Sequence, residues 1–295
     1  MPVALKTSPD GAVAQALGDV YRRLAGVCDA LDVRVDRAAG AQGGVTAAEL
    51  ATDRGALDAF VEAEAARVHD RYGVRPRPDV AASRALHDYA WTVGMLMGGP
   101  WYLERRVPRI RPEDLRLDLA SGTYTINPGS ELACLAGDPV AGRPGALTLP
   151  QEEQLRAQLR MALADHMRPL LAAIGPVARR RSRALWGMVS DDLVSALWYL
   201  GRMLGQEGAA IRAATEVLPM AVPPYPTGAD FRHLAGRTAA AIRPGPVPAA
   251  ACSTRSARPR PAPPARAPVT PNGCAAWRAR ANVNSPAGAA ASGLG

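Results

Sequence analysis

The acidic residues of this chain stop at Asp230, and this boundary limits what can fold. Residues 1–230 contain all 27 Asp and Glu and 26 of the 35 basic residues, whereas residues 231–295 contain nine Arg and no acid. Ala, Pro, Arg and Gly fill 44 of these last 65 positions without hydrophobic periodicity. Such a segment buries too little apolar surface to offset the entropy of ordering its backbone. We therefore predict a folded body, residues 1–235, and a disordered tail, residues 236–295.

The net charge of +8 comes from this tail, which permits two interpretations. A basic arm would bind nucleic acid or a partner protein through its charge. Alternatively, the tail is an unselected sequence, because Arg outnumbers Lys 34 to 1, as in a GC-rich gene, and GC-rich DNA read out of frame yields Ala, Pro, Arg and Gly. Basic arms usually mix Lys with Arg and add aromatic residues, whereas Trp277 is the only aromatic residue after Phe231. We favour the unselected sequence over a nucleic-acid arm.

Apolar residues at helical spacing dominate the body. A capping sequence at Ser8-Pro9-Asp10 predicts one helix start, and the capping box Thr46-Ala-Ala-Glu49 predicts another. Gly98-Gly99-Pro100 predicts a helix end. The expected helices cover residues 10–31, 47–72, 79–97, 151–174, 178–204 and 207–218.

Residues 101–135 change to a period of two, which is typical of strands. Leu115, Leu117 and Leu119 alternate with polar residues, and Ser121-Gly122 suits a tight turn before Tyr124. The predicted fold class is α+β, predominantly α-helical, with one small antiparallel β-meander at about residues 101–135 and a disordered C-terminal tail.

Two observations bear on the cellular location. The longest uncharged apolar run, residues 90–103, is 14 residues long, whereas a membrane span needs about 20. The first ten residues show neither a long apolar segment nor a signal cleavage site. We expect a cytoplasmic protein without a membrane span.

Few residues form a known catalytic pattern. The four His are not paired at the spacing of a helical zinc site, and no Gly-rich phosphate loop or nucleophile elbow is present. Asp191 and Asp192 are adjacent, so on a helix their side chains point about 100° apart and their spacing alone makes no acid/base dyad. We expect Cys28 and Cys134 to be small buried side chains.

The segment from Arg179 to Leu197 carries the clearest candidate site. It joins a basic start, Arg-Arg-Arg-Ser-Arg, to an apolar helix stripe that contains Trp186. Arg183 and Trp186 are three residues apart and can meet on a helix. Arg181, Arg183 and Trp186 are the predicted ligand contacts, for an anionic, partly aromatic ligand. The alternative is an amphipathic core helix with a solvated basic end.

Three segments, residues 98–108 (Gly-Gly-Pro-Trp-Tyr-Leu-Glu-Arg-Arg-Val-Pro), 183–197 (beginning Arg-Ala-Leu-Trp-Gly-Met-Val-Ser-Asp-Asp) and 226–232 (Pro-Thr-Gly-Ala-Asp-Phe-Arg), give the chain a family resemblance. It resembles the FhuF-like ferric siderophore reductases over most of residues 10–235. The resemblance implies one-electron reduction of an Fe(III) siderophore by a [2Fe-2S] cluster, with the electron coming from a donor of unknown identity.

The chain departs from the family at the cluster motif, a Cys-Cys pair followed by Cys-x-x-Cys near the C-terminus. Only Cys252 and Cys274 occur in the tail, and neither has a Cys at the next or the third following position. Two thiolates do not supply the four ligands of such a cluster. The metal ligands therefore stay unassigned, and three hypotheses remain: a reductase, a cluster-free remnant of one, and a non-catalytic binding module whose basic tail engages nucleic acid or a partner.

Overall fold

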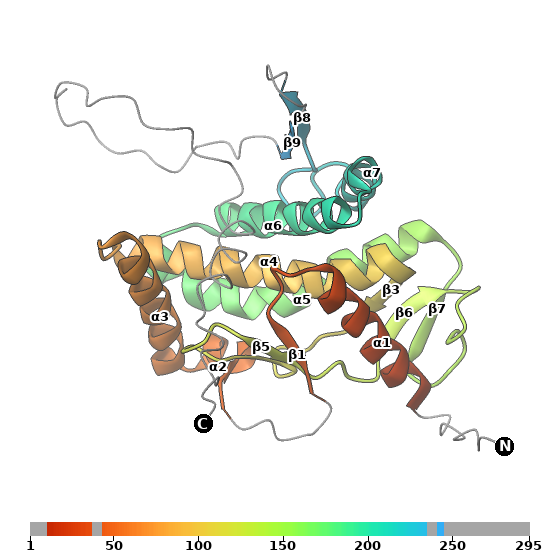
Figure 1. The fold of residues 1–295 in the computed structure, drawn as a ribbon, viewed down its shortest axis with the longest axis horizontal. Coiled ribbons are helices and arrows are strands. Elements are labelled where there is room, and N and C mark those ends of the chain that lie inside the picture. Colours follow the sequence, from red (N-terminus) through yellow and green to blue (C-terminus); the bar gives the residue numbers. More distant parts are fainter. Residues whose placement is uncertain (1–10, 37–42, 235–240, 245–295) are drawn as a thin grey trace, which may run out of the picture. The chain divides into compact units, whose positions relative to one another are not determined.

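The computed structural model of the protein describes residues 11–36, 43–234 and 241–244 (Figure 1). The chain divides into two units, Met1–Asp230 and Phe231–Gly295, and each is described by itself. The first unit is mainly helical, which confirms the predicted fold class. Its helices within the described residues are α1 (Ala12–Val27), α2 (Ala47–Thr52), α3 (Arg54–Tyr72), α4 (Pro78–Glu104), α5 (Glu152–Ala178), α6 (Ser182–Met203) and α7 (Glu207–Val217).

Helix α4 is the centre of the first unit. It packs against α1, α3, α5 and α6, and it is buried on nearly every side from Tyr89 to Trp101 (Figure 1). Its glycines allow close helix packing: a Cβ at Gly94 would lie 3.2 Å from the Cα of Leu193, and one at Gly98 would lie 3.1 Å from Leu197. Helices α4 and α6 therefore run in parallel along a stripe of small residues.

The predicted helix end at Gly98-Gly99-Pro100 is wrong, because α4 continues through Pro100 to Glu104. Trp101 to Glu104, expected in a strand, are therefore helical. Gly99 lies against Leu24 of α1, where a Cβ would approach the leucine methyl groups to 2.9 Å. These glycines permit close packing with a neighbouring helix, and the burial gained outweighs their low helix propensity.

The other helices follow the predictions with small shifts. The capping box of Thr46 and Glu49 forms, with each side chain accepting from the backbone N–H of the other residue. The helix expected over residues 47–72 is divided at Asp53, whose carboxylate accepts from the Gly55 N–H and caps α3. Helix α5 runs through Gly175-Pro176 to Ala178, and α6 begins at Ser182 instead of 178.

The strands predicted as one meander belong to two sheets. The first has the order β1 (Val33–Val35), β5 (Tyr124–Ile126), β4 (Leu115–Leu117), β2 (Val45–Thr46), and the second has the order β3 (Arg106–Pro108), β6 (Leu132–Leu135), β7 (Ala146–Leu149). The expected antiparallel pair β4–β5 forms, but β1–β5 and β6–β7 are parallel. Period two predicts strands and not their partners, which distant segments of the chain supply here.

In the second unit, the described residues form an antiparallel pair, β8 (Phe231–Leu234) and β9 (Ala241–Pro244). Residues 241–244 are thus a strand within the predicted disordered tail. The rest of that tail, and the predicted helix cap at Ser8-Pro9-Asp10, lie outside the described residues. Within the described part of the chain, no helix has both the length and the apolar composition needed to cross a bilayer.

Candidate anion-binding site

The connection between α5 and α6 consists of three arginines. Helix α5 ends at Ala178, and Arg179 adopts the left-handed conformation, with φ of 51°, that reverses the chain. Arg181 is the N-cap of α6, and its side chain makes no capping hydrogen bond. The short turn brings the end of α5 and the start of α6 side by side, so arginines from both helices meet at one corner.

Two hollows lie at this corner, one of about 580 Å³ and one of about 510 Å³. The first is formed by the last turns of α5 and the start of α6 and contains Arg181; the second lies between α6 and residues 221–226 and contains Arg183. Arg168, Ser182 and Trp186 line both. The structure therefore brings the three predicted contact residues to one place, Trp186 between the other two, and adds Arg168 from α5.

Packing fixes the indole of Trp186. Its side chain is only 7% exposed, and its ring lies edge-on to that of Tyr225, with centroids 5.7 Å apart. The Tyr225 hydroxyl donates to the Arg160 carbonyl oxygen at 2.6 Å, which anchors the segment behind the indole. The guanidinium carbon of Arg168 lies 6.0 Å from the Trp186 ring centroid. The hollows are thus separated by a rigid aromatic ring beside a cation.

Among the described residues, the arginines at this corner have no acidic partner. In the described part of the chain, thirteen arginines form ion pairs with Asp or Glu. None of the five corner arginines does, and among the described residues no Asp or Glu lines either hollow. Arg180 instead donates to the Ser83 hydroxyl at 3.0 Å. We call this set the arginine corner: Arg168, Arg179, Arg180, Arg181 and Arg183, with Trp186.

Like charges held together repel one another, and an anion placed among them removes that repulsion. Arginine suits this role because its guanidinium stays charged at any physiological pH and offers planar forks of N–H donors. The arrangement can therefore bind an anion with several negative charges, and the indole can contact an aromatic part of it.

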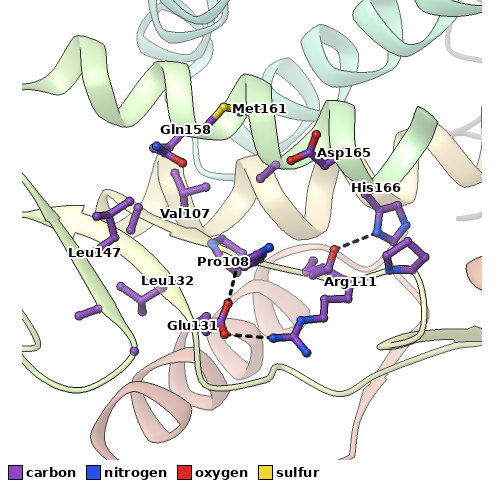
Figure 2. Close-up of a pocket in the computed structure, with 17 residues that line it drawn as sticks. Val107, Pro108, Arg111, Glu131, Leu132, Leu147, Gln158, Met161, Asp165 and His166 are labelled. Carbon is purple, nitrogen blue, oxygen red and sulfur yellow. Dashed lines mark hydrogen bonds and ion pairs between the residues drawn. The ribbon is translucent and has the colours of Figure 1, made fainter. Parts of the chain in front are cut away.

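A third hollow, of about 660 Å³, lies between the β3–β6–β7 sheet and α5 (Figure 2). Its two arginines already pair with its glutamate: Glu131 accepts from Arg109 at 3.1 Å and from Arg111 at 3.0 Å. His166 at its inner wall is fully buried and also satisfied, since Nδ1 donates to the Ile110 carbonyl at 3.0 Å and Nε2 accepts from the Tyr89 hydroxyl at 2.7 Å. Burial lowers the pKa of His166 to about 4, so the ring is neutral.

The sequence analysis missed a pairing between α4 and α6. Asp192 is fully buried, and its Oδ1 lies in close contact with Nδ1 of His87, whose side chain is 41% exposed. Burial raises the pKa of Asp192, and the neighbouring His87 opposes that shift. Burial and the adjacent Asp192 also raise the pKa of Asp191, to about 6. A signal was present, because Asp192 falls in the apolar stripe of its helix, three residues after Val189.

The described residues do not fit an iron–sulfur cluster. Cys28 and Cys134 are both buried, on different elements, and burial raises the pKa of Cys134. No group of three or more His, Cys, Asp or Glu that could hold a metal occurs among the residues that the structure describes. Cys252 and Cys274 lie outside that part of the chain. A [2Fe-2S] cluster of this type needs four thiolates.

Comparison with models of known protein families and with curated proteins found no match. The fold and the site define a mainly helical α+β protein that gathers around one tryptophan five arginines without an acidic partner among the described residues.

Proposed function

We propose that this chain binds a ferric siderophore at the arginine corner and is a cluster-free relative of the ferric siderophore reductases. The proposal joins two supports. One is the resemblance carried by residues 98–108, 183–197 and 226–232. The other is the arginine corner itself, of which Arg183 and Trp186 lie within the second of those segments.

The observation that carries the proposal is the set of five arginines without acidic partners around two hollows. Siderophores surround Fe(III) with hard anionic oxygens, which hold it far more tightly than they hold Fe(II). Exposed N–H donors of several arginines suit such an oxygen-rich surface. Hollows of this size also lie within the usual range for small-molecule sites, about 300–1,000 Å³.

The described residues contain no candidate redox centre that could reduce the bound Fe(III). The resemblance implies that one electron passes from a cluster to the bound Fe(III), giving Fe(II) and easing its release. The cysteine arrangement of this chain lacks the four-thiolate motif, so we assign it the binding step and leave the electron to a separate donor of unknown identity. A chelate that has been imported reaches the cytoplasm, and we propose that location for the protein.

The alternative function, a binding module that uses its basic tail, depends on residues outside the described part of the chain and stays a prediction. It requires nucleic-acid binding that weakens steeply with salt and disappears when residues 236–295 are deleted.

The binding proposal is tested by titrating the full chain with several Fe(III) chelates of different chemistry and measuring the heat of binding by calorimetry. At least one chelate should bind, and Trp186→Phe should weaken that binding about tenfold. The matched control is Trp198→Phe, because Trp198 lies on the same helix and also stacks with an arginine, Arg202, 4.9 Å from its ring centroid. Absence of binding by every chelate would overturn the proposal.

The cluster-free assignment has its own measurement. The purified protein should be colourless, with no iron and no acid-labile sulfide. A visible iron–sulfur spectrum with matching iron and sulfide would show that the cysteines of this chain assemble a cluster after all.

A further inference from the structure

We infer that the turn between α3 and α4 is the docking surface for a small acidic protein that carries one electron. We call this surface the α3–α4 tip and define it by Tyr72, Val74 and Val80. The inference rests on the proposed function, because it names the kind of partner that supplies the electron for the bound Fe(III). Three observations carry it: exposed apolar side chains, their place beside the arginine corner, and the charge of the two segments.

Apolar side chains are the first observation. Tyr72 is 58% exposed, Val74 is 68% exposed and Val80 is 44% exposed, and all three lie within nine residues. Exposing large apolar side chains to water costs free energy, and a cluster of them marks contact with another molecule. None of them lines the three hollows described above. A surface without a hollow suits the face of a protein better than it suits a small molecule.

The position of the tip is the second observation. Val80 and Ser83 are three residues apart on α4, so they lie on one face of the helix. The Ser83 hydroxyl accepts from Arg180 at 3.0 Å, which joins the start of α4 to the arginine corner. Figure 1 shows the α3–α4 turn and the α5–α6 connection at the same end of the first unit. A protein docked on the tip therefore lies next to the proposed chelate site.

Charge is the third observation. Residues 70–80 contain three Arg and two Asp, and residues 168–183 contain five Arg and no acid, which gives the two segments together a net charge of +6. One of the two acids, Asp79, is already paired, since it accepts from Arg77 at 2.9 Å. Such a field attracts an acidic protein from a distance and repels a basic one. The corner arginines thus steer the partner, and the tip supplies the apolar contact.

The task of the partner follows from the proposed function, which leaves the electron to a separate donor. This donor has to come close to the bound chelate. In the transfer, the reduced carrier loses one electron and becomes oxidised, and the chelated Fe(III) gains that electron and becomes Fe(II); no proton or covalent bond is transferred. Complexes of electron carriers are typically small, below about 1,200 Å², and a surface as small as one turn suits such a brief contact.

The docking test uses the full chain and two oxidised carriers, an acidic [2Fe-2S] ferredoxin and the basic cytochrome c, with binding measured by calorimetry at low and high salt. We expect the ferredoxin to bind, with an affinity that falls about tenfold as salt rises, and cytochrome c not to bind. The tip variant, Tyr72→Ser/Val74→Ser, should bind ferredoxin at least about tenfold more weakly. The matched control, Leu147→Ser/Met220→Ser, replaces side chains that are 50% and 65% exposed, on β7 and after α7, and should bind as the parent does.

A second measurement follows the electron. Reduced ferredoxin, freed of excess reductant, is mixed with the full chain and the Fe(III) chelate that binds in the titration above, and Fe(II) is detected with ferrozine. After subtraction of the rate without the chain, the tip variant should form Fe(II) at least about fivefold more slowly than the parent. Its affinity for the chelate should stay unchanged.

The outcomes separate this inference from the proposed function. Ferredoxin binding that is absent, or equally strong in the tip variant, would overturn the inference, while the chelate titration alone decides the proposed function. If ferredoxin docks at the tip but no chelate binds, the proposed function fails and the docking surface stands. Binding to phosphatidylglycerol vesicles that is lost in the tip variant, without any ferredoxin binding, would assign the tip to a lipid bilayer and overturn the inference.

Discussion

Two sets of arginines in this protein differ in their partners, and the contrast separates stability from binding. On the α3–α4 face, Arg67 and Arg84 both donate to Glu64, each at 3.0 Å from Nε, and the Glu64 side chain is only 4% exposed. At the arginine corner, five arginines share two hollows without an acid. The first group compensates a buried carboxylate, whereas the second leaves its positive charge available to solvent or to a ligand.

Two buried polar groups of the body, Glu64 and His166, follow the first pattern. Glu64 has its two arginines, and both ring nitrogens of His166 have partners from other elements. Because an unsatisfied buried polar group costs free energy, such pairings are the expected state of an interior. The arginine corner differs in that its charges remain uncompensated within the described chain, which is the pattern expected of a surface that awaits an anion.

The largest expected effect is the loss of folding stability at low pH that His166 causes. Its pKa is about 4 in the folded protein because of burial, below the ordinary value of 6.5, so between these pH values the unfolded chain binds a proton that the folded chain refuses. The free energy of unfolding therefore has its full value, as far as His166 is concerned, above about pH 6.5, and it decreases as the pH falls toward 4. The loss amounts to about 3 kcal/mol. Urea unfolding at a series of pH values measures it.

The variant His166→Gln isolates this contribution from the other titrating groups. It should be less stable than the parent at pH 7, because it disturbs the Tyr89 and Ile110 hydrogen bonds, but its stability should fall less between pH 6.5 and 4. Parallel curves for parent and variant would show that the ring does not stay neutral in the folded protein.

Glu64 gives the next effect. The variant Glu64→Gln keeps the size of the side chain but removes the charge that Arg67 and Arg84 share, which should cost about 2 kcal/mol. Glu62→Gln is the matched control, because Glu62 forms an exposed ion pair with Arg75 on the solvent side of the same helix. That change should cost less than about 0.5 kcal/mol. Equal losses in the two variants would contradict the structural role of Glu64.

Sequence reasoning found what depends on local pattern. Helical periodicity predicted the main helices, and the spacing of Thr46 and Glu49 predicted a capping box that forms. The same reasoning placed Arg183 beside Trp186 on one helix, because that proximity is local. It did not find Arg168 or Tyr225, which reach Trp186 from elsewhere in the fold.

The errors came from tertiary packing. Gly98 and Gly99 resemble a helix end in isolation, but in the fold they are the surface on which Leu197 and Leu24 pack, so α4 continues. The short strands gave no indication of their partners, since β1 pairs in parallel with β5, which is far from it in sequence, and β7 pairs in parallel with β6, the strand before it. Asp192 was dismissed on its spacing from Asp191, whereas its partner, His87, comes from another helix.

The smallest expected effect on stability is the sharpest test of the contrast. In the double variant Arg181→Gln/Arg183→Gln, two exposed side chains without ion-pair partners are replaced, so the free energy of unfolding should change by less than about 0.5 kcal/mol. At low salt the change should be stabilising, because repulsion within the arginine corner decreases, and added salt should remove that gain. Chemical unfolding at two salt concentrations measures both effects. A loss as large as that of Glu64→Gln would mean that the corner arginines hold the fold together, and the division between the two groups of arginines would then be wrong.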